Sequence, residues 1–325
     1  MILNRRLFIL ILLFAGVAVV VSLDDRAPIR LHSRCPAFEI NKDFQEYMDG
    51  VISEEYPGPV VYRVLTPYLV FWLHKGMPSV SPVTFDFFIK IFVLIAIQLS
   101  FFEYLRFFHN SFQALAGVFL FDALIGLTLS YHHGPSLPET GDLINVLVFI
   151  LALTALYLDR FALLCLILFV GTFNRETTWV LLPVFFLYNF LESRSMWRLM
   201  TAFVAVAVPY FGLRWLIDTP APIWFRTDAI QDNIPLLAEE STHYALISNV
   251  YFFVLLGPLV VTSLYQFRAH PRFLRIVGSI VPLFIVIHYA VGRIIETRIW
   301  MPLFIVLIPL VLNNLVKVLQ SETSS

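Results

Sequence analysis

Apolar runs of about 20 residues recur along this chain, and they limit what it can fold into more than any other feature. A bilayer has a hydrocarbon core about 30 Å thick, which one helix crosses with about 20 residues. Inside that core every backbone polar group needs a partner within the protein, so helices are the default spanning element. Hydrophobic residues fill 59% of the 325 positions and charged residues 14%, whereas soluble domains carry about 25% charged residues. The sequence therefore predicts an all-α, polytopic integral membrane protein.

We expect about ten crossings in a single transmembrane domain that covers residues 1–325. The runs are too long and unbroken for the alternating pattern of β-barrel strands. No small-residue cleavage site follows the first run, so we expect a retained helix rather than a signal peptide. The expected spans are 7–23, 83–105, 112–130, 141–158, 161–173, 177–192, 197–216, 245–266, 275–291 and 299–317.

The segment Val60–Leu73 is apolar but contains Arg63 and Pro67, so it predicts either an eleventh crossing or a helix at the outer interface. The distribution of charged residues between the two sides of the membrane distinguishes a crossing from an interfacial helix. If the segment does not cross, the short inner connectors and tails hold ten basic and four acidic residues, in line with the positive-inside rule. If it crossed, Arg194 and Arg272 would face outward, against that rule. The charge pattern therefore favours a segment that does not cross.

This topology places the loops that contain candidate functional residues on the extracytoplasmic side of the membrane. We expect a long first extracytoplasmic loop over 24–82, with a re-entrant or interfacial helix at about 60–75, and both termini in the cytoplasm. The sequence contains no Asn-x-Ser/Thr acceptor, which favours a bacterial inner (cytoplasmic) membrane.

The first outer loop holds candidate catalytic side chains. Asp43 and Glu46 would share one helical face at i, i+3, and a suitably tuned carboxylate deprotonates an attacking hydroxyl. The alternative is a solvated acidic loop. Arg63 lies next to Tyr62 within an apolar run. Arg63 either snorkels to the interface or serves as a fixed cation for a lipid phosphate.

The stretch after the third span contains His132, His133, Glu139 and Asp142. Such groups ligate metals or shuttle protons, but their spacing matches no recognised metal site. We therefore expect no cofactor and no metal ligands, with a divalent metal kept as an open alternative.

A polar break, Asn174-Arg175-Glu176, separates two short apolar runs. Asn174 is predicted to cap the following helix, and Glu176 suits the dipole of its first turn. Neither role explains Arg175. An arginine beside a helix N-terminus makes a phosphate or pyrophosphate site.

A second polar stretch, with Arg293, Glu296 and Arg298, opens the last span. Glu296 and one arginine are able to neutralise each other, which leaves one positive charge for an anionic head group. The chain has no phosphate-cradling glycine loop and no basic nucleic-acid surface. We therefore expect any activated substrate to carry its activating group already when it reaches the protein, for example as a lipid-linked substrate.

Two motifs resemble a known family. Asp43…Tyr47, followed by Tyr62-Arg63-Val64-Leu65-Thr66-Pro67, is similar to the Asp-x-x-x-Tyr and Tyr-Arg-x-Leu-x-Pro pattern of uncharacterised bacterial members of the GT-C superfamily. These membrane glycosyltransferases use polyprenyl-phosphate sugars. Asn174-Arg175-Glu176-Thr177 resembles their Arg-Glu element, and the expected architecture is similar over the whole chain.

The resemblance implies inverting transfer of a sugar from a polyprenyl-phosphate donor to a glycan, lipid or protein acceptor, with membrane lipids as further partners. The family's general base corresponds best to Asp43, but its acidic pair after the first helix would be Asp24-Asp25, so the base stays open. Arg175, with Arg63, Arg293 or Arg298, would stabilise the departing phosphate.

Two other functions fit the same residues. A polysaccharide polymerase or ligase of the cell envelope also binds lipid pyrophosphate with arginines. A lipid or solute transporter is the alternative from another class, although transporters tend to carry inverted repeats and broken helices near the midplane. The polar residues here gather at one edge instead.

Overall fold

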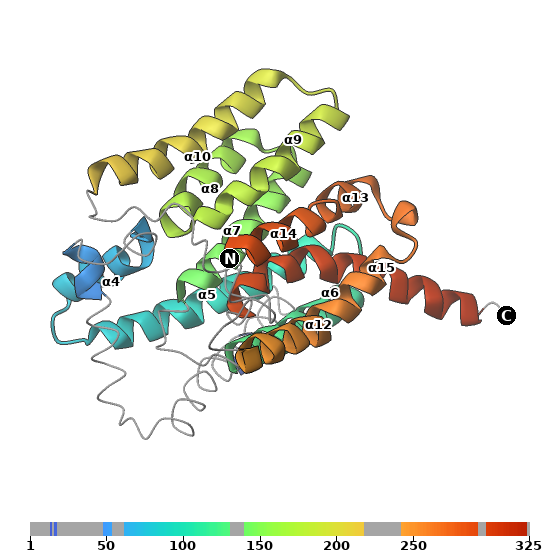
Figure 1. Cartoon of the computed structure of the whole chain (residues 1–325), viewed down its shortest axis with the longest axis horizontal. Coiled ribbons are helices and arrows are strands. Elements are labelled where there is room, and N and C mark those ends of the chain that lie inside the picture. The colour runs from blue at the N-terminus through green and yellow to red at the C-terminus, as the bar shows by residue number, and fades with distance from the viewer. Residues whose placement is uncertain are drawn as a thin grey trace, which may run out of the picture. The chain divides into compact units, whose positions relative to one another are not determined.

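The computed structural model of the chain (Figure 1) describes residues 14, 16–17, 48–53, 62–130, 140–217, 242–291 and 297–323. These residues form helices joined by short turns, and they contain no strand, which confirms the all-α prediction for this part of the chain. Several predicted site residues lie outside the described residues: Asp24, Asp25, Asp43, Glu46, His132, His133, Glu139, Arg293 and Glu296.

Within the described residues, five helices are long and apolar enough to cross a membrane. They cover Pro82–Leu105, Thr140–Tyr157, Met196–Leu216, Arg272–Ala290 and Arg298–Val318. Shorter apolar helices cover Ser111–Ile125, Phe161–Asn174, Glu176–Leu191 and Phe252–Leu264. Each run predicted between residues 83 and 317 coincides with a helix or with two consecutive helices. The architecture is that of an α-helical membrane protein.

The helices belong to two compact units that alternate along the chain. Unit 1 comprises Met1–Ser100, His133–Leu182 and Ser195–Trp224, and unit 2 comprises Phe101–His132, Pro183–Arg194 and Phe225–Ser325. A single transmembrane domain stays a prediction.

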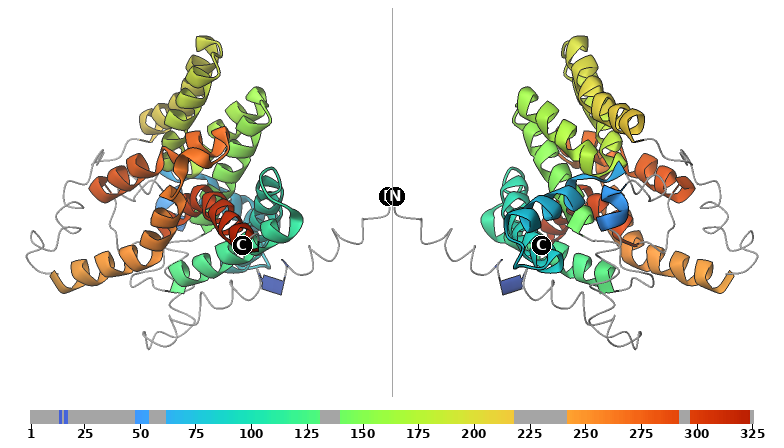
Figure 2. Two further views of the ribbon diagram at one scale, coloured as in Figure 1. Left: turned by 90° about the vertical axis from the view of Figure 1, so that its right-hand side faces the viewer. Right: turned by 90° about the vertical axis from the view of Figure 1, so that its left-hand side faces the viewer.

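Unit 1 is built around three helices, α7 (Thr140–Tyr157), α8 (Phe161–Asn174) and α10 (Met196–Leu216). Helix α8 packs against both α7 and α10, as the views of Figures 1 and 2 show. The close approach of α7 depends on Gly171, where an added Cβ would lie 2.6 Å from Cγ1 of Val148. Helix α10 leaves large apolar side chains exposed, Trp215 among them, which suits contact with lipid.

Unit 1 also contains a short helical segment at residues 48–52 and three further elements. Helix α4 covers Leu65–Gly76 and the 3-10 helix η2 covers Glu176–Val180, and the first part of α5 (Pro82–Leu105) also belongs here. Helix α4 begins five residues after the start of the predicted 60–75 helix and contacts α7 and α8.

The connections within unit 1 are short. Asp159 has a positive φ of 53°, a conformation that Asp adopts more readily than most residues, and it turns the chain from α7 into α8. At the other end of α8, Arg175 is extended, with φ −155° and ψ 147°. Of the polar break Asn174-Arg175-Glu176, only Arg175 therefore lies outside a helix, because Asn174 ends α8 and Glu176 begins η2.

In unit 2, helix α15 (Met301–Thr323) packs against α6 (Ser111–Ser130), α12 (Thr242–Leu264) and α13 (Arg272–Gly278). Residues 301–312 of α15 are buried without interruption, as expected of a helix that is apolar on all sides. The remaining elements of unit 2 are α14 (Val281–Val291), η3 (Phe267–Ala269), η4 (Thr297–Trp300), the end of α5 and most of α9 (Leu181–Leu191).

Candidate functional site

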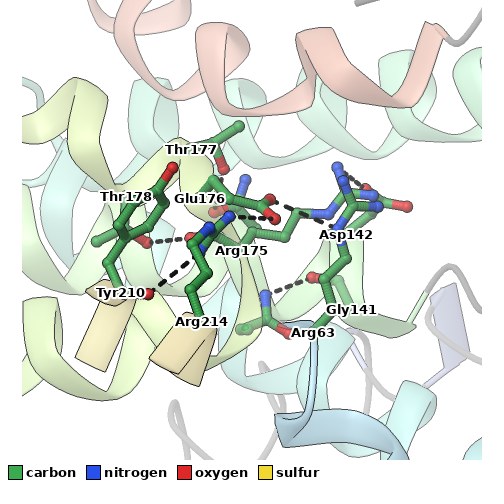
Figure 3. Close-up of polar contacts among 11 residues, drawn as sticks. Arg63, Gly141, Asp142, Arg175, Glu176, Thr177, Thr178, Tyr210 and Arg214 are labelled. Atoms are coloured by element: carbon green, nitrogen blue, oxygen red, sulfur yellow. Dashed lines mark hydrogen bonds and ion pairs between the residues drawn. The ribbon is translucent and has the colours of Figure 1, made fainter. Parts of the chain in front are cut away.

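Five charged side chains of unit 1 come together at neighbouring helix ends, and we call them the charged cluster: Arg63, Asp142, Arg175, Glu176 and Arg214 (Figure 3). They come from the residue pair before α4, the first turn of α7, the junction of α8 with η2, and the last turn of α10. Residues far apart in the sequence thus form one polar group beside apolar helices.

Arg175 and Asp142 form the buried part of the cluster. Nη1 of Arg175 lies 2.6 Å from Oδ1 of Asp142, and their side chains are 8% and 1% exposed. Asp142 is also in the first turn of α7, where the helix dipole favours a carboxylate. The charge of Arg175 is therefore balanced inside the protein, because a buried charge needs a partner.

Glu176 lies between two other arginines. Its Oε2 is 3.5 Å from Nε of Arg63, and its Oε1 is 3.7 Å from Nη2 of Arg214. Charge-assisted hydrogen bonds are shorter, at about 2.7–2.9 Å. Among the described residues, Nε of Arg63 and Oε1 of Glu176 are buried and have no hydrogen-bond partner. These groups attract one another by charge and keep hydrogen-bonding capacity for a further group.

Two tyrosine rings hold the guanidinium of Arg214. Its centre lies 3.6 Å from the ring centroid of Tyr210 and 4.2 Å from that of Tyr62. Its Nη1 also donates to the carbonyl oxygen of Tyr210 at 3.2 Å. A planar guanidinium stacks on aromatic faces in a way that a lysine cannot reproduce. Arg214 is therefore a cation in a fixed orientation.

Neutral hydrogen bonds tie η2 and the end of α8 to α7. Thr177 Oγ1 donates to Oδ1 of Asn145 at 3.0 Å, and Nδ2 of Asn174 donates to the Gly141 carbonyl at 2.7 Å. The predicted capping role of Asn174 is wrong. Asn174 is the last residue of α8, and Arg175 is the N-cap of η2, without a side-chain cap. The amide of Asn174 reaches across to α7 instead of folding back on its own chain.

Among the residues that the structure describes, the charged cluster brings three arginines together with two carboxylates. Arg175 pairs with Asp142, and Glu176 lies beside Arg63 and Arg214. The latter group is the more exposed part of the cluster, with Glu176 at 26%. The chemistry available here is recognition of an anionic group by arginine side chains.

Five predicted site residues meet in or beside this cluster: Tyr62, Arg63, Asn174, Arg175 and Glu176. Arg298 is buried in η4 of unit 2, so it belongs to the other unit. Sequence reasoning missed Arg214 and Tyr210, which it treated as part of a span. An arginine in an apolar span, four residues after a tyrosine, was the available signal.

Among the residues that the structure describes, no group of three or more His, Cys, Asp or Glu side chains is placed to hold a metal ion.

Comparison of the chain with protein-family models, curated proteins and solved structures finds no match. A functional proposal therefore rests on the chemistry of the charged cluster and on the helical architecture.

Proposed function

We propose that this protein is a membrane glycosyltransferase that moves a sugar, with inversion, from a polyprenyl-phosphate donor to an acceptor on the extracytoplasmic face. The observation that carries the proposal is the position of Arg63, Glu176 and Arg214 at neighbouring helix ends, where Nε of Arg63 is a donor that has no hydrogen-bond partner among the described residues. A phosphodiester is an anion, and arginine is suited to binding phosphate oxygens. The neighbouring apolar helices suit a polyprenyl chain.

In this proposal the chain crosses a bacterial inner membrane ten times, with both termini in the cytoplasm and α4 at the outer interface. The charge pattern supports the interfacial position of α4, because a crossing there would turn Arg194 and Arg272 outward, against the positive-inside rule.

The alternation of helix ends also supports this topology. The start of α7 and the ends of α8 and α10 contribute to the charged cluster, and the ten-crossing topology assigns all three to the outer side. At the opposite ends of the same helices, Nη1 of Arg198 lies 2.8 Å from Oδ1 of Asp159. The topology assigns both of those residues to the cytoplasmic side.

The proposed reaction is a single displacement. The acceptor hydroxyl oxygen bonds to the anomeric carbon as the bond from that carbon to the phosphate oxygen breaks. The hydroxyl proton goes to Asp43, with Glu46 as the second candidate carboxylate of the first outer loop, and the phosphate leaves with the electron pair. The leaving phosphate monoester approaches two negative charges, so the cations Arg63 and Arg214 stabilise it more than they stabilise the donor. Such differential stabilisation is what lowers a barrier.

A transfer assay tests the proposal. The protein is reconstituted in liposomes with a polyprenyl-phosphate hexose labelled in the sugar, together with bacterial envelope glycans and lipids as acceptors. We expect labelled glycan or lipid product and release of polyprenyl phosphate. Arg63→Gln and Arg214→Gln should each lower turnover about 100-fold, the usual loss for one stabilising donor, and Asp43→Asn should abolish it.

Arg198→Gln is the matched control. Arg198 also pairs with a carboxylate and lies over an aromatic ring, that of Phe161, at 5.4 Å, but at the other end of unit 1. It should keep wild-type turnover. Full turnover in both cluster variants would refute the site, and movement of donor across the vesicle without covalent product would identify a transporter instead.

A further inference from the structure

We infer that unit 2 carries a surface site for the headgroups of anionic phospholipids, formed by the connector between α12 and α13, by α13 itself and by the last part of α15. Four basic side chains make up the site, which we call the basic patch: Arg268, Arg272, Arg275 and Lys317. The inference goes beyond the proposed function, since it concerns the binding of membrane lipid and requires no transfer reaction.

The face of α13 that is not buried is entirely basic. Five of the seven residues of this helix are buried, and the two that are not are Arg272 and Arg275. These arginines are three positions apart, so their side chains lie on the same face of the helix. Neighbouring like charges on a helix repel each other, and an anion beside them relieves that repulsion.

The connector and α15 bring two further cations to the basic patch. Nζ of Lys317 donates to the Ala269 carbonyl at 3.1 Å, so this ammonium group lies next to η3. Arg268 precedes Ala269 in η3 and is exposed. Arg272 follows Ala269 by three residues and begins α13. Residues from η3, α13 and α15 thus place their positive charges at one end of these helices.

Packing and hydrogen bonding hold the connector on its neighbours. An added Cβ at Gly278 of α13 would lie 2.9 Å from Cε2 of Phe267, so the ring of Phe267 packs closely on α13. Nδ2 of Asn314 on α15 donates to the Tyr265 carbonyl at 2.7 Å. The backbone that carries Arg268 is therefore held in place, and a ligand binds without first having to order the chain.

Carboxylates balance only part of the charge of the basic patch. Nη1 of Arg272 lies 3.2 Å from Oε1 of Glu192, and the arginine side chain is 56% exposed. The other three cations, Arg268, Arg275 and Lys317, form no ion pair with a carboxylate in the part of the chain that the structure describes. Basic groups that gather in this way at a surface attract anions.

Exposed apolar side chains beside the basic patch favour a lipid as the source of the anion. Leu264 and Tyr265 come shortly before η3, and Leu315 lies two residues before Lys317 on α15; all three side chains are roughly half exposed. Phosphate from solution makes no contact that such side chains favour. A phospholipid puts its phosphate beside the basic groups and its acyl chains beside the apolar ones. The proposed topology places this connector at the cytoplasmic leaflet, where anionic lipids attract basic segments.

A charge series at Arg268 tests the inference, because this side chain is exposed and its replacement leaves the contacts of the connector intact. The full chain in micelles of a neutral detergent is titrated with phosphatidylglycerol or with zwitterionic phosphatidylcholine, and native mass spectrometry counts the bound lipid. Wild type should bind phosphatidylglycerol about 100-fold more tightly, since each of three cations without a carboxylate partner contributes about fivefold. Added salt should reduce this preference.

The variants separate charge from structure. R268K keeps the charge and should bind phosphatidylglycerol within about twofold of wild type, whereas R268Q should lose about fivefold and R268E about 25-fold. Binding of phosphatidylcholine should not change. The matched controls are R160Q and R160E, because Arg160 is an exposed arginine with the same predicted membrane side but belongs to unit 1. Both should bind phosphatidylglycerol as wild type does.

Equal affinity of wild type for the two lipids would overturn the inference. So would equal losses in the Arg160 and Arg268 variants, which would show that net charge alone attracts the lipid. Inorganic phosphate, added in excess at constant ionic strength, should leave the bound lipid in place, and its displacement of the lipid would overturn the assignment to a phospholipid. None of these measurements uses sugar transfer, so the inference and the proposed function are tested independently.

Discussion

Buried and exposed ion pairs of unit 1 have different consequences for stability. The pair of Arg175 and Asp142 is nearly inaccessible, with a separation of 2.6 Å, whereas Arg198 and Asp159 form a pair of similar length, 2.8 Å, whose side chains are 25% and 40% exposed. Removing one member of a buried pair strands the other charge in a low-dielectric surrounding. Removing one member of an exposed pair leaves a charge that water solvates.

Asp142→Asn should therefore destabilise the protein by about 3–5 kcal/mol, and Asp159→Asn by no more than about 1 kcal/mol. Denaturant unfolding in detergent micelles, followed by tryptophan fluorescence, measures both. The double variant Arg175→Met with Asp142→Leu should regain most of the stability that Asp142→Asn loses, since it removes both charges. Equal losses for the two single variants would contradict a buried role for Asp142.

Among the elements, the contact of α7 with α8 depends on the lack of a side chain at Gly171. A Cβ there would lie 2.6 Å from Val148 Cγ1 and 3.2 Å from Thr178 Oγ1. The same contact brings the end of α8 to the start of α7, where Arg175 meets Asp142. Packing between these helices thus positions the charged cluster.

Gly171→Ala should cost about 1–3 kcal/mol, as overpacking usually does, and should also weaken donor binding. Gly212→Ala on α10 is the control, since nothing lies within 4 Å of its added Cβ. That change should leave the unfolding free energy within about 1 kcal/mol of wild type or raise it, because Ala favours a helix over Gly. The melting temperatures of Gly171→Ala and Gly212→Ala, measured with wild type in one detergent, test this difference.

In unit 2, His270 joins α12 to α15. It is buried, with Nε2 3.2 Å from the Ser263 carbonyl oxygen and Nδ1 2.7 Å from Nδ2 of Asn313. This geometry fits the neutral ring, in which Nε2 donates and Nδ1 accepts. Burial, with a smaller contribution from the charge of Lys317, lowers the pKa of His270 below its usual 6.5.

The stability of the protein should therefore fall as the pH drops. Below pH 6.5 the unfolded chain takes up a proton on His270 that the folded chain does not bind, so the unfolding free energy decreases from that pH down to the lowered pKa. Melting temperatures from pH 8 to pH 5 should show this slope, and His270→Gln should reduce it. His109 should account for part of the remaining slope, because burial also lowers its pKa. An unchanged slope in His270→Gln would contradict the prediction.

For the whole molecule, every functional statement depends on which side of the membrane the helix ends occupy. Single cysteines at two exposed positions, Lys75 in the last turn of α4 and Ser195 before α10, report on this in a background without Cys35 and Cys165. A membrane-impermeant maleimide should label Lys75→Cys in intact cells and Ser195→Cys only after permeabilisation. Labelling of Ser195→Cys from outside would reverse the topology and remove the cluster from the extracytoplasmic face.

The elements could largely be predicted from the sequence, but the composition of the charged cluster could not. The runs that became α7, α8 and α10 were recognisable because hydropathy and helical hydrogen bonding are local. Asp142 was grouped with its sequence neighbours His132 and Glu139, although its partner is Arg175, and Arg214 was overlooked. These pairings depend on which helix ends are neighbours, and hydropathy does not report that.

The sequence by itself therefore determined that this chain folds into apolar helices, because a backbone in lipid must satisfy its hydrogen bonds within each segment. It also marked Arg63, Arg175 and Glu176 as polar groups in apolar surroundings. Only the tertiary structure decided which charges face one another. It paired Arg175 with Asp142 and brought Glu176 between Arg63 and Arg214, since long-range electrostatic partners follow from helix packing and not from spacing along the chain.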